Sequence, residues 1–165
     1  MRMTGKRRWW VTGLVAIWAV VLVAAAVWSA QYDPPTVRGQ SDLTVGRETL
    51  DEAVETIGSV AGAQVAVEIE PYQLTAGCRL TLARPGTEVD QTLVFTVPAG
   101  EEEPLLEQLV DELPAQWGAR YNPNRNRFFA DAGDFVAIRG EVAGEGEVRL
   151  TVSTGCRPAD TTVDE

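Results

Sequence analysis

Residues 9–30 read WWVTGLVAIWAVVLVAAAVWSA, and this stretch decides how the rest of the chain is organised. It contains 22 residues and no charged side chain, and a helix of about 20 apolar residues crosses the core of a bilayer. Lipid offers the backbone no hydrogen-bond partner, so a single spanning segment is expected to be a helix. Trp9 and Trp10 mark one end and Trp28 the other, as is typical of indole rings at membrane interfaces. The sequence therefore predicts a transmembrane helix over residues 9–30.

The charges around this helix predict its orientation. Residues 1–8 carry four basic side chains and no acidic one, and such flanks stay in the cytoplasm. The basic residues are Arg2, Lys6, Arg7 and Arg8. A cleaved signal peptide is the competing interpretation, with Ala24, Ala25 and Ala26 as a cleavage site. An uncleaved anchor is favoured because the apolar run continues through Trp28, and both interpretations export residues 31–165.

The exported part is strongly acidic. All 24 acidic residues follow the apolar stretch and four of the 14 basic residues precede it, so residues 31–165 carry a net charge of −14. This length suffices for one domain with a hydrophobic core. The charge argues against a nucleic-acid partner and against contact with an anionic membrane surface. Its simplest interpretation is solubility.

Two cysteines, Cys78 and Cys156, lie in the exported part, and each stands in a Gly-Cys-Arg tripeptide. An oxidising compartment favours a disulfide bond between them. Two thiolates without histidine do not complete a zinc site. The sequence therefore predicts a disulfide, no metal site and no cofactor.

The exported part divides into three segments. Residues 31–46 contain Asp33-Pro34-Pro35 and are expected to form an extended linker. Residues 47–158 are expected to form the domain. Residues 159–165 are polar and are expected to be a disordered tail.

The apolar periodicity predicts an α+β domain. Helices are expected at 48–60, with Thr49 as N-cap and Glu52 completing a capping box, and at 101–113, with Glu101 to Glu103 in the first turn. About six strands are expected, at 64–70, 78–82, 87–97, 127–130, 135–142 and 147–153. We expect two layers, an antiparallel sheet with two helices. The order of elements also suggests a loose αβββ duplication.

Several kinds of catalytic chemistry are excluded by composition. The chain has no histidine, and its one lysine is Lys6, so histidine-based triads and exported lysine nucleophiles are ruled out. Paired carboxylates leave a glycoside hydrolase as an alternative. These pairs are Glu68/Glu70, Glu145/Glu147 and Asp131/Asp134. Such pairs arise by chance in an acidic chain, so we expect a protein that is not an enzyme.

One short segment gathers residues suited to binding. It contains Trp117, Arg120, Tyr121, Arg125 and Arg127. Guanidinium groups bind anions in bidentate fashion and aromatic rings stack on ligands, so the segment is a candidate site for an anionic or glycan partner. The competing interpretation is that Trp117 fills the core and the arginines pair with nearby acids.

The chain resembles single-pass cell-envelope proteins common in actinobacteria. The resemblance lies in the basic leader with its anchor, in residues 131–137 (DAGDFVA) and in the two Gly-Cys-Arg tripeptides. It implies no activity. We expect a membrane-anchored binding or accessory domain with a protein or envelope partner. A carboxylate hydrolase and a structural subunit of a larger membrane complex are the alternatives.

Overall fold

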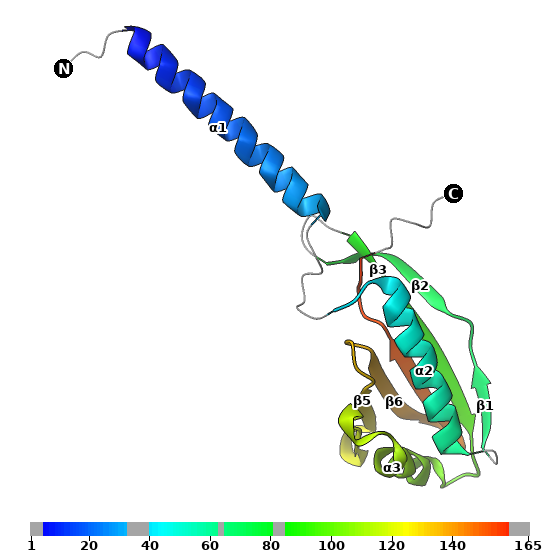
Figure 1. Cartoon of the computed structure of the whole chain (residues 1–165). Coiled ribbons are helices and arrows are strands. Elements are labelled where there is room, and N and C mark those ends of the chain that lie inside the picture. The colour runs from blue at the N-terminus through cyan, green and yellow to red at the C-terminus, as the bar shows by residue number, and fades with distance from the viewer. Residues whose placement is uncertain (1–4, 33–39, 63–64, 81–84, 159–165) are drawn as a thin grey trace.

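The computed structural model describes residues 5–32, 40–62, 65–80 and 85–158. Helix α1 (Gly5–Tyr32) comes first, and a domain of helices and strands follows it (Figure 1). The apolar part of α1, Trp9–Ser29, is 21 residues long and none of it is buried. By length and composition this helix fits a membrane anchor, as the sequence predicts.

The domain is built on one antiparallel sheet. Its strands are β1 (Ala66–Ile69), β2 (Gln73–Arg79), β3 (Pro85–Thr96), β4 (Arg120–Asn122), β5 (Arg127–Asp131), β6 (Ala137–Gly144) and β7 (Glu147–Ser153). The order across the sheet is β1-β3-β7-β6-β5-β4, and β2 also pairs with β3. Strands β4 to β7 therefore form a consecutive meander, and β1 and β2 share one edge.

Two helices, α2 (Leu43–Ala61) and α3 (Glu102–Glu112), cover one face of this sheet (Figure 1). Alternation along the strands supplies the other half of the core, because every second side chain points to the helices. The most deeply buried members are Leu50, Ile57, Leu93, Phe95, Leu106, Leu109, Phe128, Ile138, Val148 and Leu150. The two-layer α+β prediction is confirmed, and the opposite face of the sheet, which we call the outer face, carries neither helix.

The domain starts earlier than the sequence pattern predicts. Helix α2 begins at Leu43, and Asp42 is its N-cap because the Asp42 carboxylate accepts the N–H of Val45 at 3.0 Å. Thr49, the expected cap, lies inside the helix and donates its hydroxyl to the carbonyl of Val45. Gln40 and Gly46 are buried. Residues 40–46, expected to be linker, therefore belong to the domain.

The strands also differ from expectation. Among the described residues the sheet has seven strands, and the additional strand β4 is only three residues long, too short to show a period. Strand β2 begins at Gln73, five residues earlier than expected. The αβββ repeat is absent, because β1 and β2 both pair with β3 whereas β4 to β7 pair in sequence. Residues 33–39 of the linker, residues 81–84 and the tail 159–165 lie outside the described residues.

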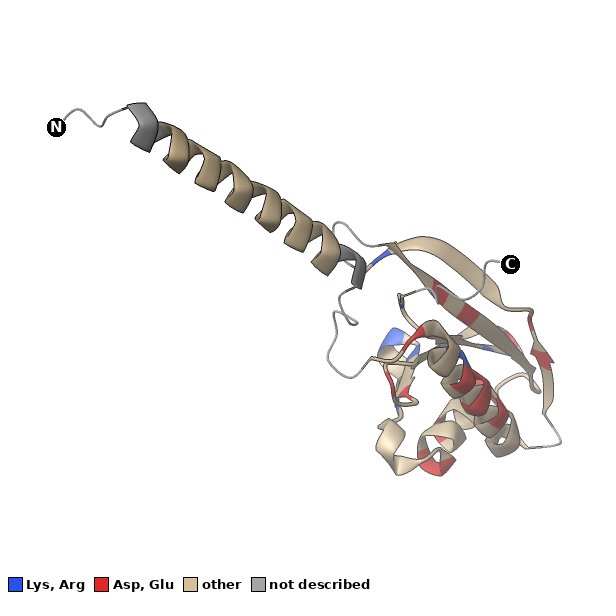
Figure 2. Ribbon diagram, turned by 45° about the horizontal axis from the view of Figure 1, so that its top comes forward, with Lys and Arg blue, Asp and Glu red and all other residues tan. Residues whose placement is uncertain are grey.

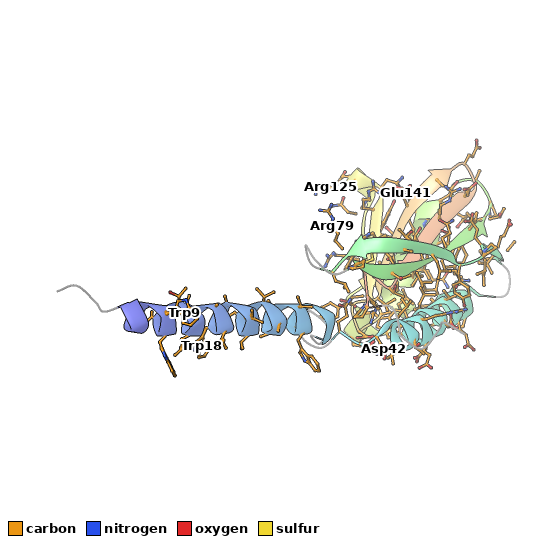
Figure 3. The ribbon with its side chains drawn as sticks, turned by 90° about the horizontal axis from the view of Figure 1, so that it is seen from above. Trp9, Trp18, Asp42, Arg79, Arg125 and Glu141 are labelled. Carbon is orange, nitrogen blue, oxygen red and sulfur yellow. A yellow bond between two sulfur atoms is a disulfide. The ribbon has the colours of Figure 1, made fainter. Side chains whose placement is uncertain are left out.

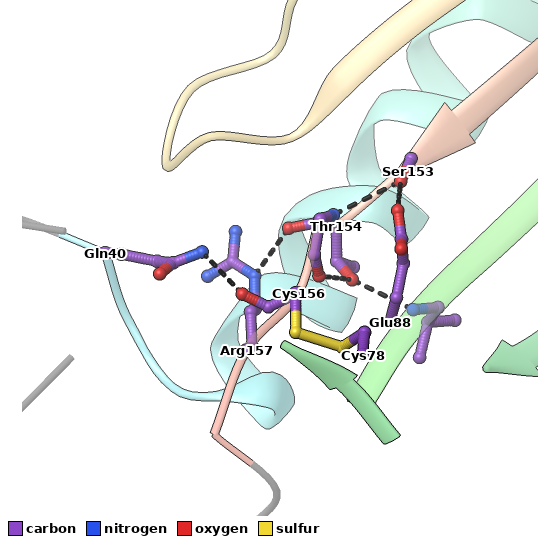
Figure 4. The surroundings of a disulfide bond; sticks show 9 residues. Gln40, Cys78, Glu88, Ser153, Thr154, Cys156 and Arg157 are labelled. Atoms are coloured by element: carbon purple, nitrogen blue, oxygen red, sulfur yellow. Dashed lines mark hydrogen bonds between the residues drawn. A yellow bond between two sulfur atoms is a disulfide. The ribbon is translucent and has the colours of Figure 1, made fainter. Parts of the chain in front are cut away.

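The predicted disulfide is formed. Cys78 at the end of β2 bonds to Cys156, with the two Cα atoms 5.8 Å apart (Figure 4). Next to it, Thr87 and Arg157 exchange two backbone hydrogen bonds of 2.8 and 2.9 Å. The cystine and this bridge hold the C-terminal segment against the beginning of β3.

A buried arginine lies beside the disulfide. The Arg157 side chain is 0% exposed and its guanidinium donates to Asp134 Oδ2 and to Ser41 Oγ, both at 2.8 Å. Its Nε donates to the carbonyl of Thr154 at 2.9 Å. The Arg157 cluster (Ser41, Asp134, Thr154 and Arg157) therefore ties together the start of α2, the β5–β6 turn and the C-terminal segment. Gln40 adds a bond from its side chain to the carbonyl of Cys156 (Figure 4).

Candidate functional site

The structure separates the five residues of the predicted binding segment. Trp117 lies in a 3₁₀ turn (Ala115–Trp117) and is only 8% exposed, within the core. Tyr121 on β4 pairs with buried Phe128 and points to the helix side. Burial raises the pKa of Tyr121, and the nearby carboxylates Glu103 and Glu107 raise it further. Both aromatic residues are therefore turned away from the outer face.

Two of the three predicted arginines lie on the outer face. On β4, Arg120 stands opposite Phe129 of β5, and its guanidinium carbon is 4.6 Å from the centre of that ring. Arg127 follows on the same face of β5, two residues before Phe129. Arg125 is exposed in the turn Pro123–Arg125 between these strands. The strand alternation thus brings the arginines together and excludes the aromatic residues.

Two more arginines, which sequence reasoning missed, extend this group. Arg139 of β6 stands opposite Phe129, and Arg149 of β7 stands opposite Glu141 of β6. Both side chains are exposed. The sequence contains the signal, since Arg149 stands between the apolar residues Val148 and Leu150 and must face the opposite side of the strand. We call Arg120, Arg127, Arg139 and Arg149 the arginine face.

Three members of the arginine face, Arg127, Arg139 and Arg149, line a shallow hollow of about 280 Å³. Two of its members have acidic neighbours: Arg127 binds Glu141 at 2.8 Å and Arg149 binds Glu147 at 2.9 Å. These side chains are 40–70% exposed, so each pair contributes only about 0–1 kcal/mol and exchanges readily for a stronger anion. Among the described residues, Arg120 and Arg139 have no ion pair within 4 Å. The face can therefore accept additional negative charge.

The two faces of the domain differ in their exposed basic residues. The exposed sides of the helices are acidic, as Figure 2 shows in red, and they carry Glu48, Asp51, Glu52 and Glu55 on α2 and Glu103, Glu107, Asp111 and Glu112 on α3. In Figure 3, Arg125 and Glu141 lie on the other side of the sheet from Asp42 and α2. An anion approaching the helix side meets mainly carboxylates, whereas one approaching the outer face meets four arginines together with Glu141 and Glu147.

A second, larger hollow of about 710 Å³ lies beside α3 and is lined by acidic residues, including Glu102, Glu103, Glu107 and Glu145. Glu102 is buried and accepts the backbone N–H groups of Gly146 and of Gly100. These bonds hold the pKa of Glu102 below its ordinary value. Glu102 therefore fastens α3 to the β6–β7 turn, and the described residues contain no group of three potential metal ligands.

Three of the carboxylates that motivated the hydrolase alternative, Asp131, Asp134 and Glu147, have other partners. Asp131 accepts the N–H of Gly133 at 2.9 Å, and Glu147 is paired with Arg149. Burial would raise the pKa of Asp134, but hydrogen bonds from Ser41 and Arg157 outweigh it and lower that pKa. A general acid needs the opposite shift, so Asp134 is unsuited to that role.

Comparisons with known protein families, with curated proteins and with solved structures found no match for this chain. The function of the chain must therefore be inferred from the arginine face and its surroundings.

Proposed function

We propose that this chain is a membrane-anchored, extracytoplasmic binding protein of a bacterial cell envelope whose arginine face recognises an anionic partner. The observation that carries the proposal is the alignment of four exposed arginines across β4 to β7, in a chain whose exported part has a net charge of −14.

The anchor part of the proposal is supported by two features. Helix α1 is long and apolar enough to span a bilayer and follows a basic N-terminus, which favours a cytoplasmic N-terminus. The bond between Cys78 and Cys156 is typical of proteins outside the reducing cytoplasm. Together they support a position of the domain on the outer side of the membrane.

The binding part follows from the chemistry and shape of the face. A guanidinium presents its N–H groups in a planar fork that matches a carboxylate or a phosphate. The four groups lie on an open sheet rather than in an enclosed cavity, so they suit the extended surface of a macromolecule. We therefore propose that the face binds an anionic partner.

The test compares two double variants with the same change in charge. Arg139→Gln/Arg149→Gln removes half of the arginine face, whereas Arg47→Gln/Arg79→Gln removes two arginines that lie elsewhere. Capture of envelope components in a membrane pull-down should fall at least tenfold for the first variant and stay near the wild-type level for the second. Capture by the wild type should also weaken as salt rises, because exposed charges are screened.

Equal capture by both variants at low salt would show that the arginine face is not the binding surface. Trp117→Phe serves as a further comparison. Since Trp117 is in the core, this change should lower the stability of the fold but leave capture unchanged.

A further inference from the structure

The turn between β5 and β6 has an unusual backbone for its sequence. Gly133, Asp134 and Phe135 all have positive φ, at 94°, 46° and 60°, and Val136 donates its N–H to the carbonyl of Gly133 at 2.8 Å. Two-residue turns with two positive φ values favour glycine or asparagine, because a Cβ atom is disfavoured there. Phe135 nevertheless occupies the second position, and its side chain is 46% exposed. The ring does not fill the core, so packing does not explain this choice of residue.

Hydrogen bonds from Ser41 and Arg157 to Asp134 fix this turn. Asp134 Oδ1 accepts the N–H of Ser41 at 3.1 Å and Asp134 Oδ2 accepts a bond from Arg157 at 2.8 Å. The Arg157 guanidinium also donates to the carbonyl of Asp134. The Arg157 cluster thus fixes the residue before Phe135 and holds the ring at the surface.

This position lies where the chain enters the domain. Ser41, which binds Asp134, is the second residue after the segment that leads from α1, and eight Cα–Cα steps separate Tyr32 from Gln40. A fully extended chain spans about 3.3–3.6 Å per residue, so the two residues are at most about 29 Å apart. Val45, in the first turn of α2, adds a second apolar side chain that is 42% exposed at this end.

We propose that Phe135 docks into the lipid interface beside the anchor and orients the domain on the bilayer. The inference rests on the anchor proposed above. Because α1 keeps the domain close to the lipid, even a weak contact is occupied for much of the time. Phenylalanine is among the apolar side chains that interfacial segments bury at the boundary between headgroups and acyl chains. The contact is apolar and therefore does not require anionic lipid, which the acidic domain would avoid.

The test uses the full chain in phosphatidylcholine nanodiscs that contain a lipid with a nitroxide near the top of its acyl chain. Amide NMR signals of Gly133 and Phe135 should be attenuated at least twofold more than the signal of Gly146, which lies in the turn at the opposite end of β6. Signals of α1 should be strongly attenuated in the same sample, which verifies the anchor separately. Equal attenuation at Gly133 and Gly146, with α1 attenuated, would overturn the inference and leave the anchor intact.

Phe135→Gly separates lipid contact from a structural role. Glycine suits the positive φ, so thermal unfolding of this variant should occur at the wild-type temperature or above it, while the attenuation at Gly133 falls to the level of Gly146. Ile69→Ser is the matched control, because Ile69 on β1 is equally exposed at 48%, and it should leave the attenuation unchanged. A lower unfolding temperature for Phe135→Gly, or undiminished attenuation at Gly133, would show that the ring serves the fold and not the membrane.

Discussion

Single residues hold the domain together at the end where the linker enters it, and Asp134 is the clearest example. It is the acidic partner of an arginine that is 0% exposed, and removing one partner of a buried pair leaves the other charge uncompensated. Asp134→Asn should therefore lower the free energy of unfolding by about 3 kcal/mol at neutral pH. Asp131→Asn, three residues away and exposed, keeps an oxygen that can accept the N–H of Gly133 and should cost about 1 kcal/mol or less.

The same residue predicts a dependence on pH. The pKa of Asp134 is lower in the folded chain than its ordinary value of 3.8. Its contribution to stability is therefore complete above that ordinary value and is lost as the pH falls through the lower folded value. The difference in unfolding free energy between wild type and Asp134→Asn should be constant from neutral pH to about pH 5 and should shrink below about pH 4. Denaturant unfolding at a series of pH values measures it, and a difference that grows on acidification would refute the assignment.

Two glycines of α2 provide a second test at this scale. A Cβ atom on Gly46 would lie 2.4 Å from Nε of Arg157, whereas one on Gly58 would meet nothing within 4 Å. Gly46→Ala should destabilise the fold by about 1–3 kcal/mol through overpacking, although alanine favours the helix. Gly58→Ala should stabilise it by about 0.5–1 kcal/mol. Urea unfolding midpoints measure both changes in stability. Stabilisation by both substitutions would show that Arg157 does not require a glycine at position 46.

Sequence patterns could not have predicted these roles. Arg79 and Arg157 follow the two cysteines in identical tripeptides, yet Arg79 is exposed and Arg157 is fully buried. Its side-chain partners Asp134 and Ser41 are 23 and 116 residues away along the chain. Local composition carries no information about contacts at such separations, so a buried arginine is found only when the fold is known.

At the scale of elements, prediction from the sequence was most accurate where the apolar periodicity extends over many residues. The last strand, Glu147–Ser153, was predicted without error because three apolar residues alternate in it. Helix α3 was predicted to within one residue at each end, from its apolar stripe and its acidic first turn. The start of α2 was wrong because Thr49 and Glu52 imitate a capping box. Burial of Gly46 beneath Arg157 extends the helix back to Leu43, and a tertiary contact of this kind overrides local propensity.

The disulfide joins elements that are otherwise held together by a few backbone bonds. Cys78 and Cys156 are 78 positions apart, and closing a loop of that size stabilises the fold by about 4 kcal/mol in the chain-entropy model. Both thiols should resist alkylation in the unfolded chain until a reductant is added. Reduction, or Cys78→Ser/Cys156→Ser, should lower the unfolding free energy by a comparable amount. Two thiols that react without reductant would disprove the bond.

For the molecule as a whole, the sequence predicted the fold class more fully than the candidate site. Composition and periodicity were enough for an apolar helix and an α+β domain, because both depend on local patterns. The arginine face depends on strand register, which places Arg120, Phe129 and Arg139 on neighbouring strands. The linear segment 117–127 therefore supplies only Arg120 and Arg127 of the arginine face. Its aromatic residues belong to the core and the helix side.

The two sides of the sheet and the point where the chain enters the domain differ in the groups they expose. The acidic helices and the arginine face lie on opposite sides of one sheet, while the chain enters at a third side, beside the Arg157 cluster. A domain fastened at that end would present both faces sideways to molecules at the membrane surface. This arrangement suits recognition of a neighbouring envelope component.

Topology is the prediction on which the other whole-molecule proposals depend. A reporter that is active only outside the cytoplasm, fused after Glu165, should be active, and the chain should fractionate with membranes while keeping its N-terminal segment. Replacing Arg2, Lys6, Arg7 and Arg8 with glutamine should reduce the exported fraction, because the basic flank sets the orientation. The same reporter fused after Gly5 should be inactive in the wild type. A soluble mature chain that begins near Val27 would remove the anchor, and with it the lipid contact of Phe135. The arginine face would remain as a binding surface of a secreted domain.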